Sequence, residues 1–389
     1  MVVNFEFLGG EPIENLITCM NFKIDKVVFF GYHSVIEEQK AKTEKFLKKY
    51  CGVQTVVFHP LSPNNLQSTL NTMRKEVQHE RSQKNRIFFD ITGGESLILV
   101  AFGMLSKEFE TPMHMYDIPN DKLIELDDGA RICISNDVEM RKIPMSLKLL
   151  IKMHGGKINK NLYKEIKEID DPEFMDDVEK IYQVAKQNWD FWNPFSSLLR
   201  EIMVPIDPAT MQVSKRAQTI LNALGASNTK LKTIRKLNDI VDSLAEEGIL
   251  LDVDHADGHY RFRFKNQAVK DCLWEGGSIL ELHTCQREAV HSSECQVGVH
   301  IDWDGVIHSQ PGVDVLNEID VLALDGYIPT FISCKTGKMG AQQALHALYE
   351  LETVASRFGG KYAKKVLVTA KELGEVYLER AAEMGIEVR

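Results

Sequence analysis

The sequence lacks several features that mark specialised classes of protein. Among its 389 residues, no apolar run approaches the ~20 residues that a membrane-spanning helix needs. The chain does not begin with a basic segment followed by an apolar stretch, so we expect neither a signal peptide nor a membrane partner. The seven cysteines are scattered, form no CxxC pair and are odd in number. This usage favours reduced thiols in the cytoplasm over a disulfide framework or a structural zinc site.

A positive net charge is also missing. The formal net charge is −10, whereas a chain that coats nucleic acid carries a basic field, because neutralised phosphates supply most non-specific affinity. Any contact with nucleic acid is therefore expected to be local, with metal ions offsetting the repulsion between like charges. The absence of a GxGxxG motif and of a P-loop lysine argues against dinucleotide binding and nucleoside triphosphate hydrolysis.

The first part of the chain, residues 1–142, alternates strand and helix signals. Apolar strand-like runs occupy 2–8, 26–31, 55–58, 86–91 and 113–118, and helical spacing occupies 35–49, 64–82 and 96–106. Strands that alternate with helices indicate a parallel sheet covered by helices on both faces.

The remaining sequence divides into two further segments. Residues 143–270 are mainly helical, and they end with two helices, at 217–224 and 231–247, followed by a strand pair at 249–264. Two helices before a hairpin are typical of a winged helix. The alternative is a connector that only borrows this shape, and the lack of an arginine-rich recognition helix favours it. Residues 271–389 contain a helix at 277–287, strand signals at 296–303, 318–324, 330–334 and 365–369, and a long helix at 340–357. This predicts a second α/β domain.

A group of polar residues lies on a predicted hairpin in the C-terminal segment. Two apolar strands flank Asp325 and Gly326, a pair that is typical of a tight turn. Asp320 lies near the start of the first strand, and Ser333 and Lys335 lie two residues apart on the second. Because side chains alternate between the faces of a strand, Ser333 and Lys335 share one face, and Cys334 and Ile332 point to the other face, into a core. The hairpin is therefore predicted to bring an acid and a lysine together.

These residue types suit phosphodiester hydrolysis, which needs an activated water and stabilised charge on the phosphoryl oxygens. A Mg²⁺ or Mn²⁺ ion held by carboxylates supplies both, since hard cations prefer oxygen ligands, and a lysine stabilises the transition state. Glu281, a polar residue among apolar neighbours in the predicted helix 277–287, adds a second carboxylate. The alternative is a solvated hairpin whose charges have no chemical role.

A second candidate site lies at the strand ends of the N-terminal segment. The strand that ends at Asp90 leads through Thr92, Gly93 and Gly94 into an apolar helix. Glycines let the backbone approach a ligand closely, and N–H groups at a helix start attract phosphate. In open α/β sheets, ligands bind at the carboxyl ends of the strands. The candidate ligand residues are Gly9, Gly10, Glu11, Tyr32, His33, Thr92, Gly93, Gly94, Glu95 and Ser96. A plain strand-to-helix turn is the alternative.

Both sites resemble parts of one family. The arrangement of Glu281 on a helix, Asp320 on a strand and Lys335 on the next strand resembles the PD-(D/E)xK nucleases. The stretches Asn-Glu-Ile-Asp-Val-Leu and Ile-Ser-Cys-Lys-Thr-Gly look like the nuclease half of the CRISPR-associated Rossmann-fold (CARF) effector nucleases. The stretch Asp-Ile-Thr-Gly-Gly is similar to the ligand loop of the CARF domain. This resemblance implies a Rossmann-like CARF domain, a helical or winged-helix-like connector and a restriction-endonuclease-like domain.

The resemblance also implies residue roles. Glu281, Asp320, Ser333 and Lys335 take the catalytic positions, with Ser333 standing where the family usually carries Asp or Glu. Glu281, Asp320 and the carbonyl of Cys334 are then the expected metal ligands, with Glu318 as a further carboxylate.

The family ligand is a cyclic oligoadenylate, with cyclic tetra-adenylate the expected size, bound across a two-fold homodimer. At that loop Glu95 and Ser96 replace the usual Thr-Lys. The expected activity is activator-dependent cleavage of DNA and/or RNA in type III CRISPR antiviral defence.

Two other functions remain open from the sequence. The chain could be a ligand-responsive transcription regulator with an inactive nuclease domain, or a ring nuclease that degrades its own cyclic ligand. A basic run near the C-terminus, made of Arg357, Lys361, Lys364 and Lys365, is either a contact for a nucleic-acid backbone or a solvated helix end.

Overall fold

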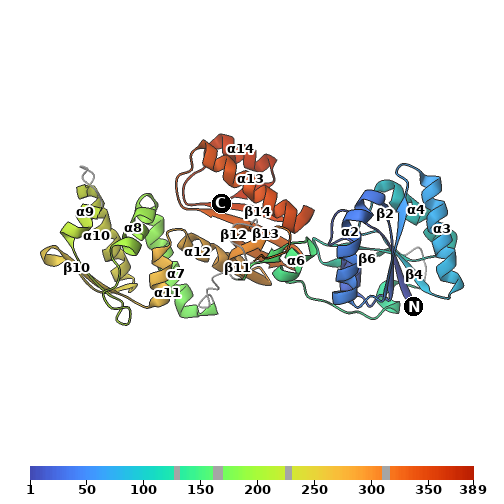
Figure 1. Ribbon diagram of the computed structural model, residues 1–389, viewed down its shortest axis with the longest axis horizontal. Coiled ribbons are helices and arrows are strands. Elements are labelled where there is room, and N and C mark those ends of the chain that lie inside the picture. Colours follow the sequence, from blue (N-terminus) through green and yellow to red (C-terminus); the bar gives the residue numbers. More distant parts are fainter. Residues whose placement is uncertain (127–131, 161–169, 224–229, 309–315) are drawn as a thin grey trace.

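The computed structural model describes residues 1–126, 132–160, 170–223, 230–308 and 316–389. Figure 1 shows three parts arranged in a row along the longest axis. The N-terminal α/β part occupies one end, the C-terminal sheet lies in the centre, and the helical region from the middle of the sequence occupies the other end. Within the described ranges, no helix is long and apolar enough to cross a membrane.

The N-terminal part is a six-stranded sheet with strand order β3-β2-β1-β4-β5-β6. All neighbouring pairs are parallel except β5 and β6. Its strands are β1 (Val2–Phe7), β2 (Lys26–Tyr32), β3 (Thr55–Leu61), β4 (Arg86–Asp90), β5 (Met113–Asp117) and β6 (Lys122–Leu126). Its helices are α1 (Ile17–Asn21), α2 (His33–Phe46), the π-helix η1 (Leu47–Cys51), α3 (Leu66–Ser82), α4 (Ser96–Phe109) and α5 (Ile134–Asp137). The predicted parallel sheet is confirmed.

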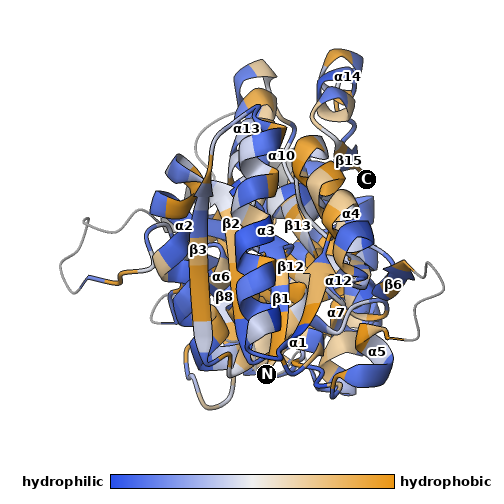
Figure 2. Cartoon of the chain, turned by 90° about the vertical axis from the view of Figure 1, so that its right-hand side faces the viewer, coloured by the Kyte–Doolittle hydropathy of each residue, from blue (hydrophilic) through white to orange (hydrophobic). Residues whose placement is uncertain are grey.

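Helices cover both faces of this sheet because its apolar strands are buried on both sides. One face packs against α3 and α4, and the other packs against α1, α2 and η1. Figure 2 shows the strands as apolar bands behind α3, whose outer surface is hydrophilic. The carboxyl ends of the parallel strands are thereby left at one open edge, where loops can hold a ligand.

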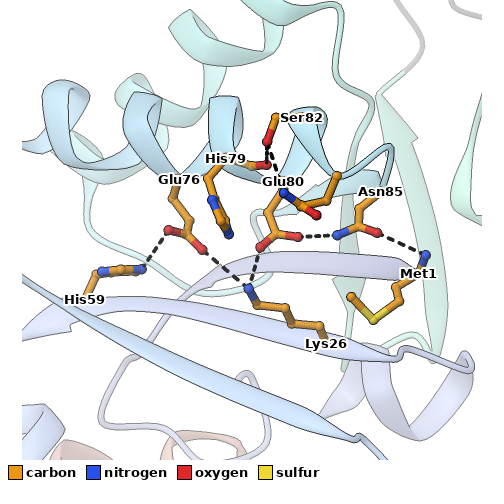
Figure 3. A network of polar contacts seen from close by, with 9 residues as sticks. Met1, Lys26, His59, Glu76, His79, Glu80, Ser82 and Asn85 are labelled. Carbon is orange, nitrogen blue, oxygen red and sulfur yellow. Dashed lines mark hydrogen bonds and ion pairs between the residues drawn. The ribbon is translucent and has the colours of Figure 1, made fainter.

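A polar network fixes the opposite end of the sheet (Figure 3). The Lys26 ammonium, at the start of β2, lies 3.5 Å from the Glu76 carboxylate and also pairs with Glu80, both on α3. Asn85 donates to Glu80 at 2.6 Å, and His59 lies 3.3 Å from Glu76. Burial is the largest influence on the pKa of Glu80 and acts to raise it, but the hydrogen bonds from Lys26 and Asn85 and the Lys26 charge together outweigh burial, and the pKa is lowered. The end of the sheet away from the candidate ligand loops is therefore held rigidly.

The helical region contains the element order of a winged helix. A small antiparallel sheet with order β8-β10-β9 packs on helices that precede and separate its strands. The elements are α7 (Pro172–Gln187), α8 (Trp189–Glu201), β8 (Gln212–Arg216), α9 (Ala217–Ala223), α10 (Lys230–Glu246), β9 (Leu250–Asp254), η3 (Ala256–Gly258), β10 (His259–Phe264) and α11 (Gln267–Trp274). The helices and hairpin match the prediction, whereas β8 was not predicted because its sequence is largely polar.

The C-terminal part is a second six-stranded sheet with order β15-β14-β13-β12-β11-β7. Strands β11, β12 and β13 are antiparallel neighbours, and β14 and β15 continue in parallel. Its elements are α6 (Leu147–Met153), β7 (Lys157–Ile158), α12 (Ser278–Ala289), β11 (Glu294–Asp302), β12 (Leu316–Asp325), β13 (Ile328–Lys335), α13 (Ala341–Gly359), η4 (Gly360–Tyr362), β14 (Lys364–Thr369), α14 (Glu375–Glu383) and β15 (Ile386–Val388).

The segment 143–270, expected to connect the two α/β parts, occupies another place in space. Its first elements, α6 and β7, belong to the C-terminal sheet: Leu147 and Ile151 pack in that core, and β7 pairs with β11. The rest lies beyond the C-terminal sheet, on the side away from the N-terminal part (Figure 1). The segment 143–270 links the two α/β parts along the chain, but most of it does not lie between them in space. The two α/β parts contact each other directly.

The turn of the β12–β13 hairpin forms one of these direct contacts, because it packs inside the N-terminal part. Tyr327 and Ile328 are buried within the core of the N-terminal part. Asn21 of α1 donates to the Tyr327 hydroxyl at 3.1 Å, and the Tyr327 ring meets Tyr116 edge-on at 6.1 Å. The hairpin predicted around Asp325 therefore forms, and its tip lies inside the other α/β part.

Candidate functional site

The β12–β13 hairpin brings the predicted C-terminal residues together. Oδ2 of Asp320, on β12, accepts hydrogen bonds from the Ser333 hydroxyl at 3.0 Å and from the Cys334 backbone N–H at 2.6 Å. The Lys335 ammonium lies 3.6 Å from the same oxygen. One carboxylate oxygen thus meets a hydroxyl, a backbone donor and a cation, all from the neighbouring strand. The Asp320 side chain is held in one orientation at the sheet surface.

Glu281 approaches this group from α12. Burial, followed by the charges of Asp320, Glu318 and Glu275, raises the pKa of Glu281 to about 8, and Lys335 opposes the shift only in part. Two carboxylates that repel each other in a partly buried site are a common preparation for a divalent cation, which relieves the repulsion. The repulsion between Glu281 and Asp320 is the observation that best supports a metal ion at this site.

The carboxylates alone do not form a complete set of metal ligands. Within the described part of the chain, no three His, Cys, Asp or Glu side chains lie close enough together to hold a metal ion. Glu318, the further carboxylate, lies within β12 two residues before Asp320, so it shares that face of the strand, and it is exposed. A Mg²⁺ ion usually keeps several waters and needs only one or two carboxylates, so Asp320 and Glu281 suffice.

Cys334 contributes its backbone rather than its thiol. The sulfur is buried in the core under α12, where it lies 3.8 Å from the Thr284 hydroxyl. Burial and then the nearby Asp320 charge raise the pKa of this thiol well above its ordinary value. The neutral thiol is therefore unsuited to metal binding or nucleophilic attack, as its predicted position on the apolar face implied. Only the carbonyl remains as the predicted metal ligand.

The helical region supports the site through residues that sequence analysis did not identify. The Thr336 hydroxyl, directly after Lys335, donates to the Asn193 side chain of α8 at 3.1 Å. A Cβ built on Gly276, before α12, would lie 2.7 Å from Asn193 Oδ1. The Lys371 ammonium pairs with Asp190 at 2.6 Å. Helix α8 therefore contacts the loops on both sides of the candidate catalytic group.

The N-terminal candidate residues gather at the carboxyl edge of the first sheet, after β1, β2 and β4. The loop after β4 is positioned from below: Asp90 Oδ1 accepts the Thr92 backbone N–H at 2.8 Å, and the Thr92 hydroxyl accepts the Tyr116 N–H at 2.9 Å. Gly94 has φ +135°, a backbone conformation that side chains rarely adopt. Gly94, Glu95 and Ser96 are exposed, and Ser96 begins α4. The loop is built as a fixed, open turn.

Negative charge is prominent at this edge. Tyr32 donates to the Glu95 carboxylate at 2.7 Å, and burial together with this bond raises the pKa of Tyr32 to about 12. His33 is exposed, with Nε2 3.3 Å from the Glu37 carboxylate. Gly9 forms reciprocal hydrogen bonds with the Asn15 side chain, both at 3.0 Å. The exposed Gly10 is the adjoining loop position that remains open.

Glu11 and Glu14 connect this edge to the C-terminal part. Glu11 accepts the Lys361 backbone N–H at 2.8 Å, a close approach that Gly360 permits because a Cβ there would lie 2.2 Å from Glu11 Oε2. The Glu14 carboxylate pairs with the Lys361 ammonium at 2.5 Å and accepts the Tyr362 hydroxyl at 2.8 Å. Glu11 was predicted to face the ligand, but its carboxylate faces the other sheet.

Glu14 also touches the glycine loop. A Cβ built on Gly93 would lie 3.0 Å from Glu14 Oε2. The side chain of Glu14 is therefore placed between the loop after β4 and the segment 360–362 of the C-terminal part. No local sequence signal identifies Glu14, since its role depends on contacts with residues far away in the chain.

The basic run predicted near the C-terminus is mostly engaged within the protein. Lys361 pairs with Glu14, Lys365 pairs with Glu352, and Arg357 donates to the His154 carbonyl at 2.9 Å. These contacts hold α13 and η4 in place. Lys361 therefore contributes to the packing between the two α/β parts, whereas Arg357 and Lys365 contribute to packing within the C-terminal part.

Two solved structures share the architecture of this chain over nearly their whole length. The protein VC1899 from Vibrio cholerae aligns with a TM-score of 0.68 and 15% identity, covering 100% of this chain and 93% of that one. Can2 from Sulfobacillus thermosulfidooxidans, in complex with cyclic tetra-adenylate, aligns with a TM-score of 0.64 and 15% identity, covering 100% and 95%. No family profile and no curated protein sequence matches the chain. The likeness confirms the fold.

The raised pKa of Glu281 predicts a pH-dependent stability. Its pKa of about 8, against an ordinary value of 4.5, means that the folded protein keeps a proton that the unfolded chain releases. The resulting stabilisation is fully present below pH 4.5, declines as the pH rises and is lost above about pH 8. We predict that Glu281→Gln flattens the fall in unfolding temperature over this window, by the equivalent of at least about 1 kcal/mol.

The control for this measurement is Glu375→Gln, on the exposed first turn of α14. It should leave the pH dependence of thermal unfolding unchanged. Parallel curves for the native protein and Glu281→Gln, in buffers without divalent cations, would contradict the raised pKa.

Proposed function

We propose that this protein is a homodimeric, cytoplasmic, metal-dependent nuclease that a cyclic oligoadenylate activates in type III CRISPR antiviral defence. The carboxyl edge of the first sheet binds the cyclic ligand, and the β12–β13 site cleaves DNA and/or RNA. The single observation that carries the proposal is the convergence of Ser333, Cys334 N–H and Lys335 on Asp320, opposite a Glu281 whose pKa is raised.

The identity of the activator rests on the loop geometry and on one neighbour. The fixed, exposed turn at Gly93 and Gly94 presents backbone N–H groups at the start of a helix, an arrangement that suits phosphates. Can2, which has the same fold along the whole chain, was solved with cyclic tetra-adenylate. The same ligand is therefore the first one to test here.

The residues of the β12–β13 site are suited to phosphodiester cleavage. A bound Mg²⁺ or Mn²⁺ supplies an activated water and neutralises charge on the phosphate. Asp320 and Glu281 would hold it, together with the Cys334 carbonyl. Glu281 must first lose the proton that it retains below about pH 8. The Lys335 ammonium, next to Asp320, is placed to stabilise negative charge on the phosphoryl oxygens.

The surface next to the ligand loop supports the proposed two-fold dimer. Helix α4 starts at Ser96 and exposes Val100 and Met104, which lie one turn apart, with the partly exposed Leu97 on the same side. Exposed apolar side chains in a row favour burial against a second copy. A ring of adenylates lying across such an axis would meet the same loop from both subunits.

The winged-helix order favours a second candidate, a ligand-responsive regulator that binds duplex DNA without cutting it. The wing is less basic than its sequence suggests, because Arg261 pairs with Asp254 at 3.1 Å and Arg263 pairs with Asp252 at 3.2 Å. A footprint on a specific duplex, with no cleavage in Mn²⁺, would choose this candidate.

The catalytic assignment predicts the effect of two substitutions. We expect Asp320→Ala combined with Lys335→Ala to lower the cleavage rate by at least roughly 10²–10³-fold, the usual loss when a group that stabilises the transition state is removed. The matched control, Glu375→Ala with Lys364→Ala, removes an exposed acid and an exposed lysine of the C-terminal part outside the site and should cleave normally. Nuclease activity that survives the first pair in a folded protein would show that the site is elsewhere.

The proposed ligand site predicts that binding of the cyclic ligand depends on Gly94. Gly94→Val places a side chain where φ is +135° and where even a Cβ lies 3.0 Å from Leu99, so the loop must change shape. We expect this variant to lose most of its affinity for cyclic tetra-adenylate in calorimetric titration, whereas Gly340→Ala, at the start of α13, should bind normally. The native protein should be titrated with cyclic hexa-adenylate as well.

Two results of that titration would change the account. Binding of neither ring by the native protein would reject the sensor. Linear adenylate products that persist in Asp320→Ala would support a ring nuclease at the N-terminal edge instead.

Glu14 is predicted to couple the two sites. An anionic ligand at the glycine loop is repelled by the Glu14 carboxylate, which bonds to Lys361 and Tyr362 of the nuclease part. We expect Glu14→Gln to bind cyclic tetra-adenylate at least as tightly as the native protein. Its ratio of activated to basal cleavage should nevertheless fall by about 5-fold or more, the lower range of typical coupling energies. The control is Glu37→Gln, exposed on α2 at the same edge. An unchanged ratio of activated to basal cleavage would show that Glu14 does not couple ligand binding to cleavage.

A further inference from the structure

A large cleft separates the N-terminal part from one edge of the C-terminal sheet. It has a volume of about 1090 Å³, and its walls come from α2 and η1 on one side and from α6 and β7 on the other. None of the candidate catalytic or ligand residues lines it. The cleft is therefore separate from both sites described above.

Exposed lysines line both walls of this cleft. Those on α2 and η1 follow one another at helical spacing, and those on α6 are four residues apart, so each set faces one direction. The seven are Lys42, Lys45, Lys49, Lys148, Lys152, Lys157 and Lys160. None of them forms an ion pair with a carboxylate in the described ranges, although Lys48, beside them on η1, pairs with Glu44 at 2.6 Å. In a chain of net charge −10, this concentration of unpaired lysines is unusual.

Positive charge gathers around Tyr50 in the cleft. The Tyr50 phenol has a pKa below its ordinary value, because Lys152 hydrogen-bonds to it and the charges of Lys152, Lys49 and Lys148 add to this effect, which burial opposes. The two acids that line the cleft accept backbone N–H groups, Glu294 from Leu147 at 2.8 Å and Asp304 from Val306 at 2.8 Å, and within the described part of the chain neither pairs with a lysine of the cleft. The lysines outnumber these two carboxylates, so positive charge remains for an anionic ligand.

An aromatic ring lies among these lysines. The Tyr50 ring is partly exposed, and the ammonium groups of Lys49 and Lys152 lie 5.5 and 5.6 Å from its centroid. A basic groove with an aromatic platform is how proteins hold single-stranded nucleic acid, because the lysines follow the backbone and the ring stacks on a base. Gln39 and Gln296 add amide groups to the same walls.

The cleft and the catalytic group draw on different residues of the C-terminal part. Glu294 and Gln296 of β11 line the cleft, whereas Asp320, Ser333 and Lys335 lie on β12 and β13 and Glu281 lies on α12. A strand bound in the cleft therefore contacts none of the candidate catalytic residues.

We propose that this lysine-lined cleft is an exosite that holds a single-stranded nucleic acid by its phosphates, outside the catalytic site. This inference rests on the proposed nuclease function. It explains how an acidic protein engages a polyanion: the contact is local and is built from both α/β parts. Because binding and cleavage are separated, the cleft should influence long substrates and leave short ones unaffected.

The test compares two triple variants of the full-length protein that lose the same charge. Lys49→Ala/Lys148→Ala/Lys152→Ala removes cleft lysines, and Lys48→Ala/Lys75→Ala/Lys107→Ala removes exposed lysines elsewhere. Affinity for a long labelled oligothymidylate and for a long labelled oligouridylate is measured by fluorescence anisotropy in EDTA over a range of salt concentrations. We expect the cleft variant to bind at least about 10-fold more weakly, with a salt dependence lower by roughly 2, since each contact with a single strand contributes about 0.7.

Cleavage of long and tetranucleotide substrates in Mn²⁺ completes the test. The cleft variant should show a raised KM for the long substrate, an unchanged kcat, and native kinetics on the tetranucleotide. Equal binding by the two triple variants would overturn the exosite, even if the native protein cleaves. Conversely, lysine-dependent binding by a protein that never cleaves would support the cleft and reject the nuclease.

Discussion

The β12–β13 hairpin belongs to two parts of the molecule at once. Its strands carry Asp320, Ser333 and Lys335, and its turn places Tyr327 within the core of the N-terminal part, where Asn21 bonds to the tyrosine hydroxyl. A tightly packed core transmits a small displacement because it cannot deform continuously. Any rearrangement of the first sheet must either carry the hairpin with it or expose Tyr327. The candidate catalytic residues therefore sit on an element that senses the packing of the other part.

The two ends of the first sheet are held differently. Glu11 and Glu14 bond to the segment 360–362 at the edge where the glycine loops lie, while the Lys26 network fixes the far end of the same sheet. A ligand at the proposed site on the glycine loops would act at the end that Glu11 and Glu14 connect to the C-terminal part. For activation, it must bind the cleavage-competent arrangement more tightly than the idle one. The winged-helix region lies beyond the catalytic sheet and supports it through Asn193, so it is not required as a relay.

Much of this architecture could be predicted from local sequence. The apolar strands and intervening helices indicated the parallel sheet, and the two-residue alternation placed Ser333 beside Lys335 and turned Cys334 into the core. The hairpin turn at Asp325 and Gly326 also formed as expected, with Asp325 opposite Ile328. These features depend on neighbours in sequence, so a periodic pattern carries them.

The residues that were missed depend on contacts between distant segments. Strand β7 is only two residues long, too short for a pattern, and it exists because β11 offers an edge. Glu14 and Asn193 carry no motif, and their roles arise from Lys361 and Thr336, more than a hundred residues later. The cleft lysines are spread over α2, η1, α6, β7 and the residues after β7, and they become one surface only when α6 faces α2. Glu11 lies on a loop at the carboxyl edge of the first sheet, as the sequence indicated, but the direction of its side chain required the fold.

The most direct test of the central claim is cleavage of single-stranded DNA, RNA and supercoiled plasmid in Mn²⁺, with and without cyclic tetra-adenylate. The account predicts that at least one of these substrates is cut, that cyclic tetra-adenylate accelerates the cutting, and that EDTA abolishes it. Cleavage at the same rate without the cyclic nucleotide, or none on any substrate when the nucleotide is bound, would contradict it.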